Sequence, residues 1–277
     1  MRQLIVAVAL LGVCTSPLFA QWPRYRVPAV PRTAAGAPDL NAAAPRTPDG
    51  KPDLSGIWEN FRKPGEAPVR SVNAQFFDDR PPSLVNEFRD IGENVKGGLP
   101  LQAWAAALKQ QRTAEHSKDN PDAHCLPIGL TQLHNHPQPR KMIQTPSLLL
   151  ILYEANGGIR QIFTDGRSLP SNDPQPWWYG YSIGKWEGDT LVVETSGFRD
   201  DVWLDVNGAP LTNVAKMTER FRRLDYGSLE IEVTVDDPKA YTKPWTAAKI
   251  RQRLMPDDEL IEFVCAENER STQRFAK

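Results

Sequence analysis

From Lys141 onward the chain alternates short β-prone runs with tight turns, and this alternation restricts the fold more than any other feature. Runs such as "SLLLILYEA" and "TLVVETS" are separated by turn residues such as "NGG", "GD" and "DYG", and the last run is "ELIEFVCAE" (259–267). Tight turns join antiparallel neighbours. About nine strands in sequence order predict a mainly β fold, an antiparallel up-and-down barrel.

One hairpin can be aligned residue by residue. If "DYG" is a three-residue loop, Arg222 faces Glu230 and Arg220 faces Glu232 on one side, while apolar residues such as Phe221 and Ile231 meet on the other. A slip of one strand by one residue would place charged residues opposite apolar residues on both faces of the hairpin. This register places Glu219 on the apolar, interior side of the barrel.

A carboxylate in that position needs a partner or a purpose. One hypothesis is that Glu219 has a raised pKa and serves as a general acid or base, together with Asp165 from a nearby loop. The alternative is a buried structural network in which Glu219 pairs with an inward Arg or a Tyr hydroxyl. Gln252, flanked by Ile250 and Leu254 at period two, is predicted to face the same interior and to contact a ligand there.

The stretch "KWEGDTLVVETSGF" (185–198) permits two interpretations. A two-residue Gly188-Asp189 turn places Trp186 opposite Leu191, so that every residue has a structural role in a hairpin. The alternative is a catalytic role for Glu187 or Asp189. We favour the hairpin.

The earlier run "DLSGIWEN" (53–60) is predicted to form the first strand. Its Gly56-Ile57-Trp58 resembles the Gly-x-Trp signature of lipocalin-like barrels, in which an Arg near the chain end packs over the Trp. The resemblance implies a lipocalin-like barrel with Arg270 or Arg274 over a buried Trp58. The chain departs from that pattern by an insert after the first strand, which is predicted to be helical at about 80–120 because it carries apolar residues at helical spacing.

A second resemblance covers most of residues 52–277. The segments "RQIFTDGRSLP", "YSIGKWEGDTLVVETSGF" and "VDDPKAYTKPW" resemble a widespread family of secreted bacterial proteins, common in acidobacteria and proteobacteria, that often begins "PDLSGIW". The family has no agreed biochemical function. The resemblance therefore implies export and a shared fold, but no reaction and no catalytic residues.

The N-terminus is typical of an exported protein. Residues 1–20 combine a basic start, the apolar run "LIVAVALLGVC" and a small residue at Ala20, which predicts a signal peptide cleaved after Ala20 and a periplasmic or secreted location. Residues 21–52 are rich in proline without an apolar period and are predicted to be a disordered linker. Residues 53–277 would then form a single barrel domain.

The net charge, the hydropathy and the cysteines of the chain indicate which partners and which compartment to expect. The formal net charge is −1, so we expect no nucleic-acid partner, and the absence of a second long apolar run predicts no membrane span in the mature chain. Cys125 and Cys265 remain after signal removal, and an oxidising compartment favours a disulfide between them over two separate buried thiols.

The loop from Asp165 to Gly180 is the main candidate for a ligand site, because long loops in compact domains are usually functional. It brings together Arg167, Asp173, Trp177, Trp178 and Tyr179. Paired aromatic rings beside an Arg and an Asp suit a ring-shaped or sugar-like ligand. The alternative is that the tryptophans only plug the barrel end.

Other chemistry has less support in the sequence. His124, His134 and His136 are candidate zinc ligands, but their spacing matches no metal signature, so no metal is expected. No P-loop, dinucleotide fingerprint or Gly-x-Ser-x-Gly elbow occurs, and no cofactor is expected.

These patterns lead to three hypotheses about function. The first is a barrel that binds a small, partly apolar or ring-containing ligand under the Trp-rich loop. The second is a hydrolase, lyase or isomerase of such a ligand, and the third is an envelope module that docks a protein partner.

Overall fold

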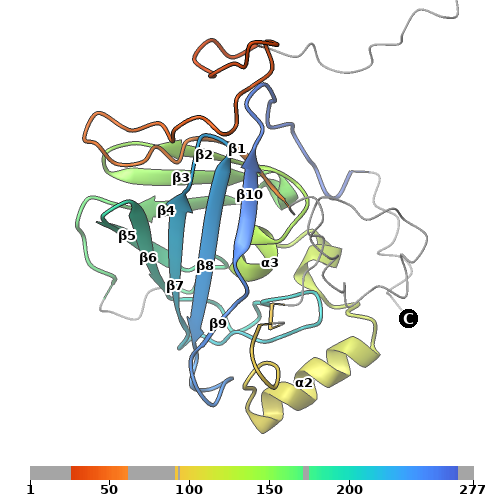
Figure 1. Cartoon of the computed structure of the whole chain (residues 1–277). Helices are drawn as coiled ribbons and strands as arrows, with labels where there is room; N and C mark the ends of the chain where they lie inside the picture. Colours follow the sequence, from red (N-terminus) through yellow and green to blue (C-terminus); the bar gives the residue numbers. More distant parts are fainter. Residues whose placement is uncertain (1–25, 62–90, 93, 171–174, 268–277) are drawn as a thin grey trace, which may run out of the picture.

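The chain forms one β-barrel, seen in the computed structural model of Figure 1, which describes residues 26–61, 91–92, 94–170 and 175–267. The strands run in the order β10-β1-β2-β3-β4-β5-β6-β7-β8-β9, and the further pairing of β10 with β8 closes a nine-stranded barrel. The strands are β1 (Gly56–Asn60), β2 (Arg140–Gln144), β3 (Leu148–Tyr153), β4 (Ile159–Phe163), β5 (Tyr181–Glu187), β6 (Thr190–Ser196), β7 (Lys216–Arg223), β8 (Ser228–Asp236), β9 (Trp245–Thr246) and β10 (Ile250–Leu254). The predicted mainly β barrel is confirmed.

One pairing departs from the up-and-down pattern. β4 and β5 are parallel, with Ile162 beside Ser182 and Phe163 beside Ile183. Parallel neighbours need a long crossover that returns the chain to the same end of the sheet. Residues 164–180, the Trp-rich loop, make this crossover, which explains why the loop is too long for a hairpin turn.

Both predicted hairpin registers are confirmed. β7 and β8 pair Arg222 with Glu230 and Arg220 with Glu232, which places Glu219 opposite Val233. β5 and β6 pair Trp186 with Leu191 across the Gly188-Asp189 turn. Glu219 has no exposed surface and therefore faces the interior, as the alignment predicted.

The described part of the predicted linker is ordered, contrary to expectation. Residues 26–55, here called the N-terminal strap, run along the barrel end that is uppermost in Figure 1. The amides of Tyr226 and Gly227 in the β7–β8 loop donate to the carbonyls of Ala42 and Leu40. Low apolar content and many prolines predicted disorder, but these contacts with the barrel hold the strap in place.

The strap contains two copies of one turn. The segments "PRTAAGAPDL" (31–40) and "PRTPDGKPDL" (45–54) make equivalent backbone hydrogen bonds, such as Thr33 N to Ala37 O and Thr47 N to Lys51 O. In each copy the Arg makes two hydrogen bonds to an aspartate outside the strap: Arg32 bonds Asp257 in the segment after β10, and Arg46 bonds Asp189 at the β5–β6 turn.

The Arg46 contact explains Asp189 of the "KWEGDTLVVETSGF" stretch. Arg46 Nη1 and Nη2 lie 2.9 and 2.8 Å from the two carboxylate oxygens of Asp189. The Asp189 carboxylate therefore binds the strap at the β5–β6 turn. The stretch is a hairpin whose turn contacts the strap.

Trp58 is buried, as the Gly-x-Trp motif predicted, but its neighbour comes from the barrel. The guanidinium of Arg223 on β7 lies 5.0 Å from the centre of the Trp58 ring, and Arg223 donates to the carbonyl of Asp53. Arg270 and Arg274 lie outside the described residues.

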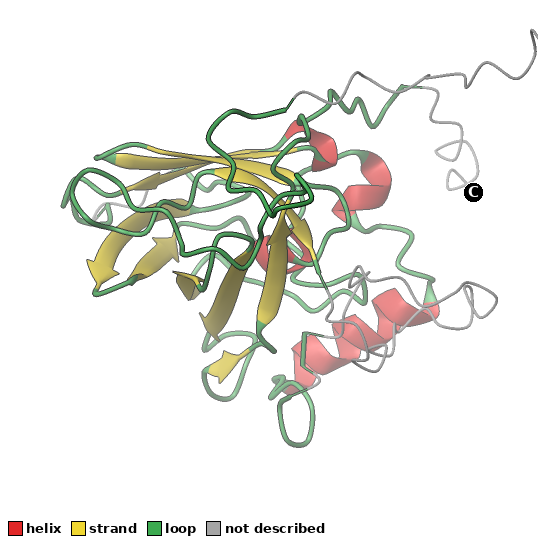
Figure 2. Ribbon diagram, turned by 45° about the horizontal axis from the view of Figure 1, so that its top comes forward, coloured by secondary structure: helices red, strands yellow, loops and turns green. Residues whose placement is uncertain are grey.

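The helical segments gather on one side of the barrel (Figure 2). They are α2 (Ala103–Ala114), the 3-10 turn η2 (Pro121–His124), α3 (Leu130–His134) and a second short 3-10 turn, η3 (Ala155–Gly157). Every residue of α3 is buried. The helical insert predicted at about 80–120 is thus represented by α2 in the described part of the chain.

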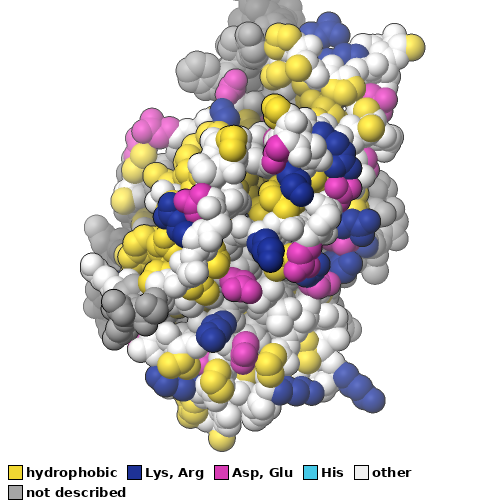
Figure 3. Space-filling view, turned by 90° about the vertical axis from the view of Figure 1, so that its left-hand side faces the viewer, with side chains coloured by type: hydrophobic (Ala, Val, Ile, Leu, Met, Phe, Trp, Pro, Cys, Tyr) yellow, Lys and Arg dark blue, Asp and Glu magenta, His cyan; other side chains and the backbone are white. Residues whose placement is uncertain are grey.

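Charges of both signs are mixed on the face that Figure 3 shows. Lys and Arg side chains alternate there with Asp and Glu, and hydrophobic side chains form patches between them. Neither sign of charge is gathered into one continuous patch on this face.

The C-terminal run differs from its predicted conformation. Residues 255–267 follow β10 without forming a strand, and the apolar side chains of Ile261, Phe263 and Val264 are exposed. The predicted disulfide is confirmed, because Cys125 and Cys265 are bonded with their Cα atoms 5.5 Å apart. The bond fixes this run to η2 where strand pairing does not.

We expect the disulfide to contribute strongly to stability, because it closes a loop with a sequence separation of 140 residues. Loop-closure entropy alone gives about 5 kcal/mol for such a loop. Cys125→Ser with Cys265→Ser should therefore lower the free energy of unfolding by several kcal/mol in urea titrations. A double variant as stable as the wild type would contradict this expectation.

Candidate functional site

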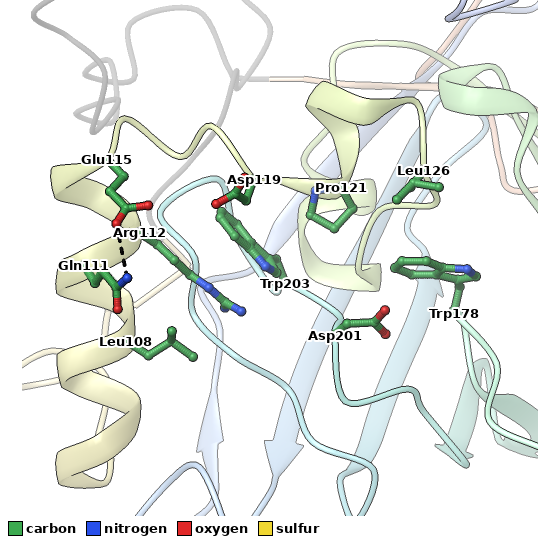
Figure 4. A pocket seen from close by; sticks show the side chains of 10 residues that line it. All are labelled: Leu108, Gln111, Arg112, Glu115, Asp119, Pro121, Leu126, Trp178, Asp201 and Trp203. Atoms are coloured by element: carbon green, nitrogen blue, oxygen red, sulfur yellow. Dashed lines mark hydrogen bonds between the residues drawn. The ribbon is translucent and has the colours of Figure 1, made fainter. Parts of the chain in front are cut away.

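A pocket of about 300 Å³ lies between α2, η2 and the Trp-rich loop (Figure 4). We call it the Trp178 pocket. Trp178 and Trp203 form aromatic walls, Arg112 extends into it from α2, and Asp201 lies between the two tryptophans. Small-molecule sites are concave, largely apolar and carry a few directed polar groups. The Trp178 pocket is concave but more polar than this, because five of its ten lining residues are apolar or aromatic and five are polar or charged.

A tight turn holds Trp203 and brings it to α2. Leu204 N donates to Ala209 O, and the Asp205 carboxylate accepts from Asn207 N and Ala209 N. Gly208 has a positive φ of 83°, and a Cβ there would lie 2.5 Å from Arg112 Cδ. Glycine is therefore required both for the turn and for the approach of α2.

Each tryptophan of the pocket has an arginine stacked on it. The guanidinium carbon of Arg112 lies 4.3 Å from the ring centre of Trp203, and that of Arg199 lies 4.5 Å from the ring centre of Trp178. Arg199 also makes two hydrogen bonds of 2.8 and 2.7 Å to Asp201. These contacts hold the indoles and the polar groups in fixed positions.

Trp178 also lines a second pocket of about 300 Å³, here called the Tyr179 pocket. Trp177, Tyr179, Ile159 and Arg199 line it as well. Trp177 N donates to Gly197 O and Arg199 N donates to Trp177 O, which joins the end of the crossover to the segment after β6. The two pockets therefore share Trp178 as a lining residue, and we refer to the two together as the cleft.

Three of the predicted ligand-binding residues meet in this cleft, namely Trp177, Trp178 and Tyr179. Arg167 does not line it. Its guanidinium stacks 3.8 Å from the ring centre of Phe163 and bonds Asp165 and Tyr181. Asp173 lies outside the described residues, and Gln252 is buried, with its amide near the carbonyl of His134.

The barrel interior contains a network of buried charges around Glu219. Arg160 of β4 donates to both carboxylate oxygens of Glu219, and His134 Nε2 lies 2.6 Å from Oε1. Arg160 also donates to the hydroxyls of Ser182 and Thr195. The buried structural network, the alternative to a catalytic role for Glu219, is therefore present.

This network lowers the pKa of Glu219, whereas a general acid needs a raised pKa. Burial alone would raise the pKa, but the charge of Arg160 and the hydrogen bonds from His134 and Arg160 outweigh it and lower the pKa to about 2. Burial lowers the pKa of His134, so this imidazole is neutral at pH 7 and donates from Nε2. Glu219 therefore lacks the raised pKa of the general-acid hypothesis, because Arg160 and His134 provide the compensating charge and hydrogen bonds of the alternative, the buried network.

Asp165, the second predicted catalytic carboxylate, is not in the interior. It is exposed and makes an ion pair of 2.6 Å with Arg167, whose hydrogen bonds lower the pKa of Asp165. Asp165 and Glu219 therefore do not form an acid and base pair.

The three candidate histidines have separate partners. His134 bonds Glu219, His136 lies 3.4 Å from Asp122, and His124 lies 2.9 Å from the carbonyl of Lys118. Among the residues that the structure describes, no group of three His, Cys, Asp or Glu residues is placed to hold a metal ion.

Sequence reasoning missed Arg112, Asp201 and Trp203 in the cleft and Arg160 in the interior. Arg160 carried a usable signal, because in "IRQIF" it alternates with Ile159 and Gln161 and lies on the same face as Ile162. Arg112 and Trp203 carried none, since their meeting depends on how α2 packs against the turn at 203–210.

No protein-family model, no curated protein and no solved structure matches this chain. Of the helices in the described part of the chain, none has the length and apolar character needed to cross a membrane. The predicted signal peptide, residues 1–20, lies outside the described residues. Function is therefore inferred from the cleft itself.

We expect Glu219→Gln to lower the free energy of unfolding by about 3 to 5 kcal/mol, because removing one partner of a buried ion pair leaves Arg160 uncompensated. The control is Glu187→Gln, whose exposed pair with Arg220 should contribute less than about 1 kcal/mol. Urea titrations of both variants measure the difference. Equal effects would contradict a buried pair.

The same network predicts an acid-dependent loss of stability. Because the pKa of Glu219 falls from 4.5 to about 2 on folding, its contribution is complete above about pH 4.5 and is lost as the pH falls towards 2. The stability gap between wild type and Glu219→Gln should therefore be constant above pH 5 and shrink below it. A gap that is unchanged at pH 3 would refute the assignment.

Proposed function

We propose that this chain is an exported barrel protein that binds a small, ring-containing ligand in the cleft on both sides of Trp178. The observation that carries the proposal is the Trp178 pocket, in which two tryptophans, a guanidinium and a carboxylate surround about 300 Å³. Indole faces bind the flat face of a ring by stacking, while Arg and Asp direct its polar substituents. Export is supported by the signal-like N-terminus and by the disulfide.

The ligand site lies at the crossover loop and not in the centre of the barrel. Glu219, Arg160 and His134 occupy the interior together with buried apolar side chains such as Phe221 and Val193, all of them exposed by 2% or less. A ligand would have to displace this network to reach the barrel axis. The cleft at Trp178 requires no such displacement.

An enzyme that uses Glu219 has less support. A general acid works best when its pKa lies near the operating pH and when it reaches the substrate. Glu219 has a pKa of about 2 and no exposed surface. The interior carboxylate therefore supports stability better than proton transfer.

A protein partner is the second candidate function, and the Tyr179 pocket favours it. Ile159 and Trp177 line this pocket and expose 61% and 46% of their surface. Exposed aromatic and aliphatic side chains around a hollow are typical of interaction surfaces. A partner that docks there would contact Trp177 more than Trp203, which is buried.

Four probes test ligand binding: indole-3-carboxylate, indole-3-carboxamide, glucuronate and glucuronamide. We expect saturable binding of at least one of them by saturation-transfer NMR and titration calorimetry, with Trp178→Ala lowering the affinity at least tenfold, about 1.4 kcal/mol. Stacking with an indole commonly contributes this much.

Trp104→Ala is the matched control for this experiment. Trp104 is an exposed tryptophan of α2 that donates to Lys239 O and lines neither pocket, so its loss should leave the affinity unchanged. The proposal fails if no probe binds at millimolar concentration, or if both variants lower the affinity equally.

A further inference from the structure

Arg112 is held in the Trp178 pocket by few polar contacts. It lies in the last turn of α2, is half-buried, and stacks on Trp203. The one hydrogen bond that its side chain makes to a described residue is from Nη1 to the carbonyl of Gly208, at 2.9 Å. Within the described part of the chain, no carboxylate forms an ion pair with it, so its charge is only partly compensated.

The other buried or clustered arginines are better satisfied. Arg160 has the Glu219 carboxylate, Arg199 has Asp201, and Arg140 donates to three backbone carbonyls. Burial lowers the pKa of Arg112, and the nearby charges of Asp205 and Asp119 act against this effect without cancelling it. An anion placed against Arg112 would recover part of the solvation that the guanidinium loses.

We propose that Arg112 binds the acidic group of the ligand, so that the ligand class is a ring compound with one carboxylate. This inference rests on the proposed function. The ring would lie against Trp178, on the far side of the pocket from α2 (Figure 4). Arg112 would hold the carboxylate by charge-assisted hydrogen bonds, which a guanidinium makes in pairs. Aromatic acids and sugar acids share this chemistry.

The carboxylates around the pocket limit the ligand to one acidic group. Asp201 is engaged by Arg199, and Glu115 by Gln111 and Lys118. Asp119 is exposed, where water and salt screen its charge. Arg112 can therefore attract one negatively charged group of a ligand. A second acidic group would be repelled by the aspartates. They also offer oxygen acceptors for ligand hydroxyls.

The four probes separate charge from ring type. Each acid has an amide of nearly the same shape, so the ratio of the two affinities measures the effect of the carboxylate charge on binding. Comparison of the indole pair with the sugar pair distinguishes aromatic acids from sugar acids. We expect the acid of at least one pair to bind ten times more tightly than its amide at low salt. This preference should weaken as ionic strength rises.

Substitution of Arg112 tests the assignment directly. Arg112→Gln should remove the preference for the acid and leave the affinity for the amide within about twofold, while Arg112→Lys should retain part of the preference because the charge remains. Arg220→Gln, an exposed arginine paired with Glu187 outside the cleft, should change neither affinity. Thermal melts establish that each variant folds.

Several outcomes would overturn the inference. A wild-type protein that binds amide and acid equally would refute it and leave the proposed function standing, and this comparison needs no variant. A preference for the acid that survives in Arg112→Gln would assign the carboxylate to another cation. Absence of binding by all four probes would refute both the inference and the proposed function.

Discussion

The ion pair between Arg160 and Glu219 is the interaction on which the rest of the barrel depends. Two charges without exposed surface are costly unless hydrogen bonds satisfy them, and here Ser182, Thr195 and His134 provide these bonds. The network connects β4, β5, β6, β7 and α3. A slip of β7 by one residue would turn Glu219 outward and leave Arg160 unpaired, so the pair selects one register.

The cleft inherits its geometry from this interior. His134 is the last residue of α3, and the hydroxyl of Thr131 in the same helix donates to Leu204 O, next to Trp203. Gly129, which precedes α3, lies so close that a Cβ would be 2.0 Å from Trp203 O. The hydrogen bond between His134 and Glu219 thus joins α3 to the buried ion pair, and α3 contacts the turn that carries Trp203. Trp203 in turn lines the Trp178 pocket.

Local patterns predicted what depends on neighbours in the sequence. Alternation and turn chemistry predicted both hairpin registers and the inward direction of Glu219, because period-two patterning fixes the faces of a strand. The burial of Trp58 was implied by the resemblance to the Gly-x-Trp motif. The strap was missed because its order comes from contacts with distant residues, although the repeated "PRT" and "PDL" motifs were visible in the sequence. The run "ELIEFVCAE" has strand propensity but no partner, because β10 occupies the closing position between β1 and β8. Arg112 and Trp203 meet only through tertiary packing.

The disulfide and one ion pair link the C-terminal run and the strap to the neighbourhood of the Trp178 pocket. The strap reaches the C-terminal run through Arg32 and Asp257, and Cys265 joins that run to Cys125, the residue before Leu126 of the Trp178 pocket. Partly exposed ion pairs such as Arg32 with Asp257 contribute little by themselves. The covalent bond therefore provides a stronger restraint on the C-terminal run than the Arg32–Asp257 pair does. An oxidising compartment would then supply this covalent restraint, and with it a fixed position for Leu126 in the wall of the ligand site that we propose.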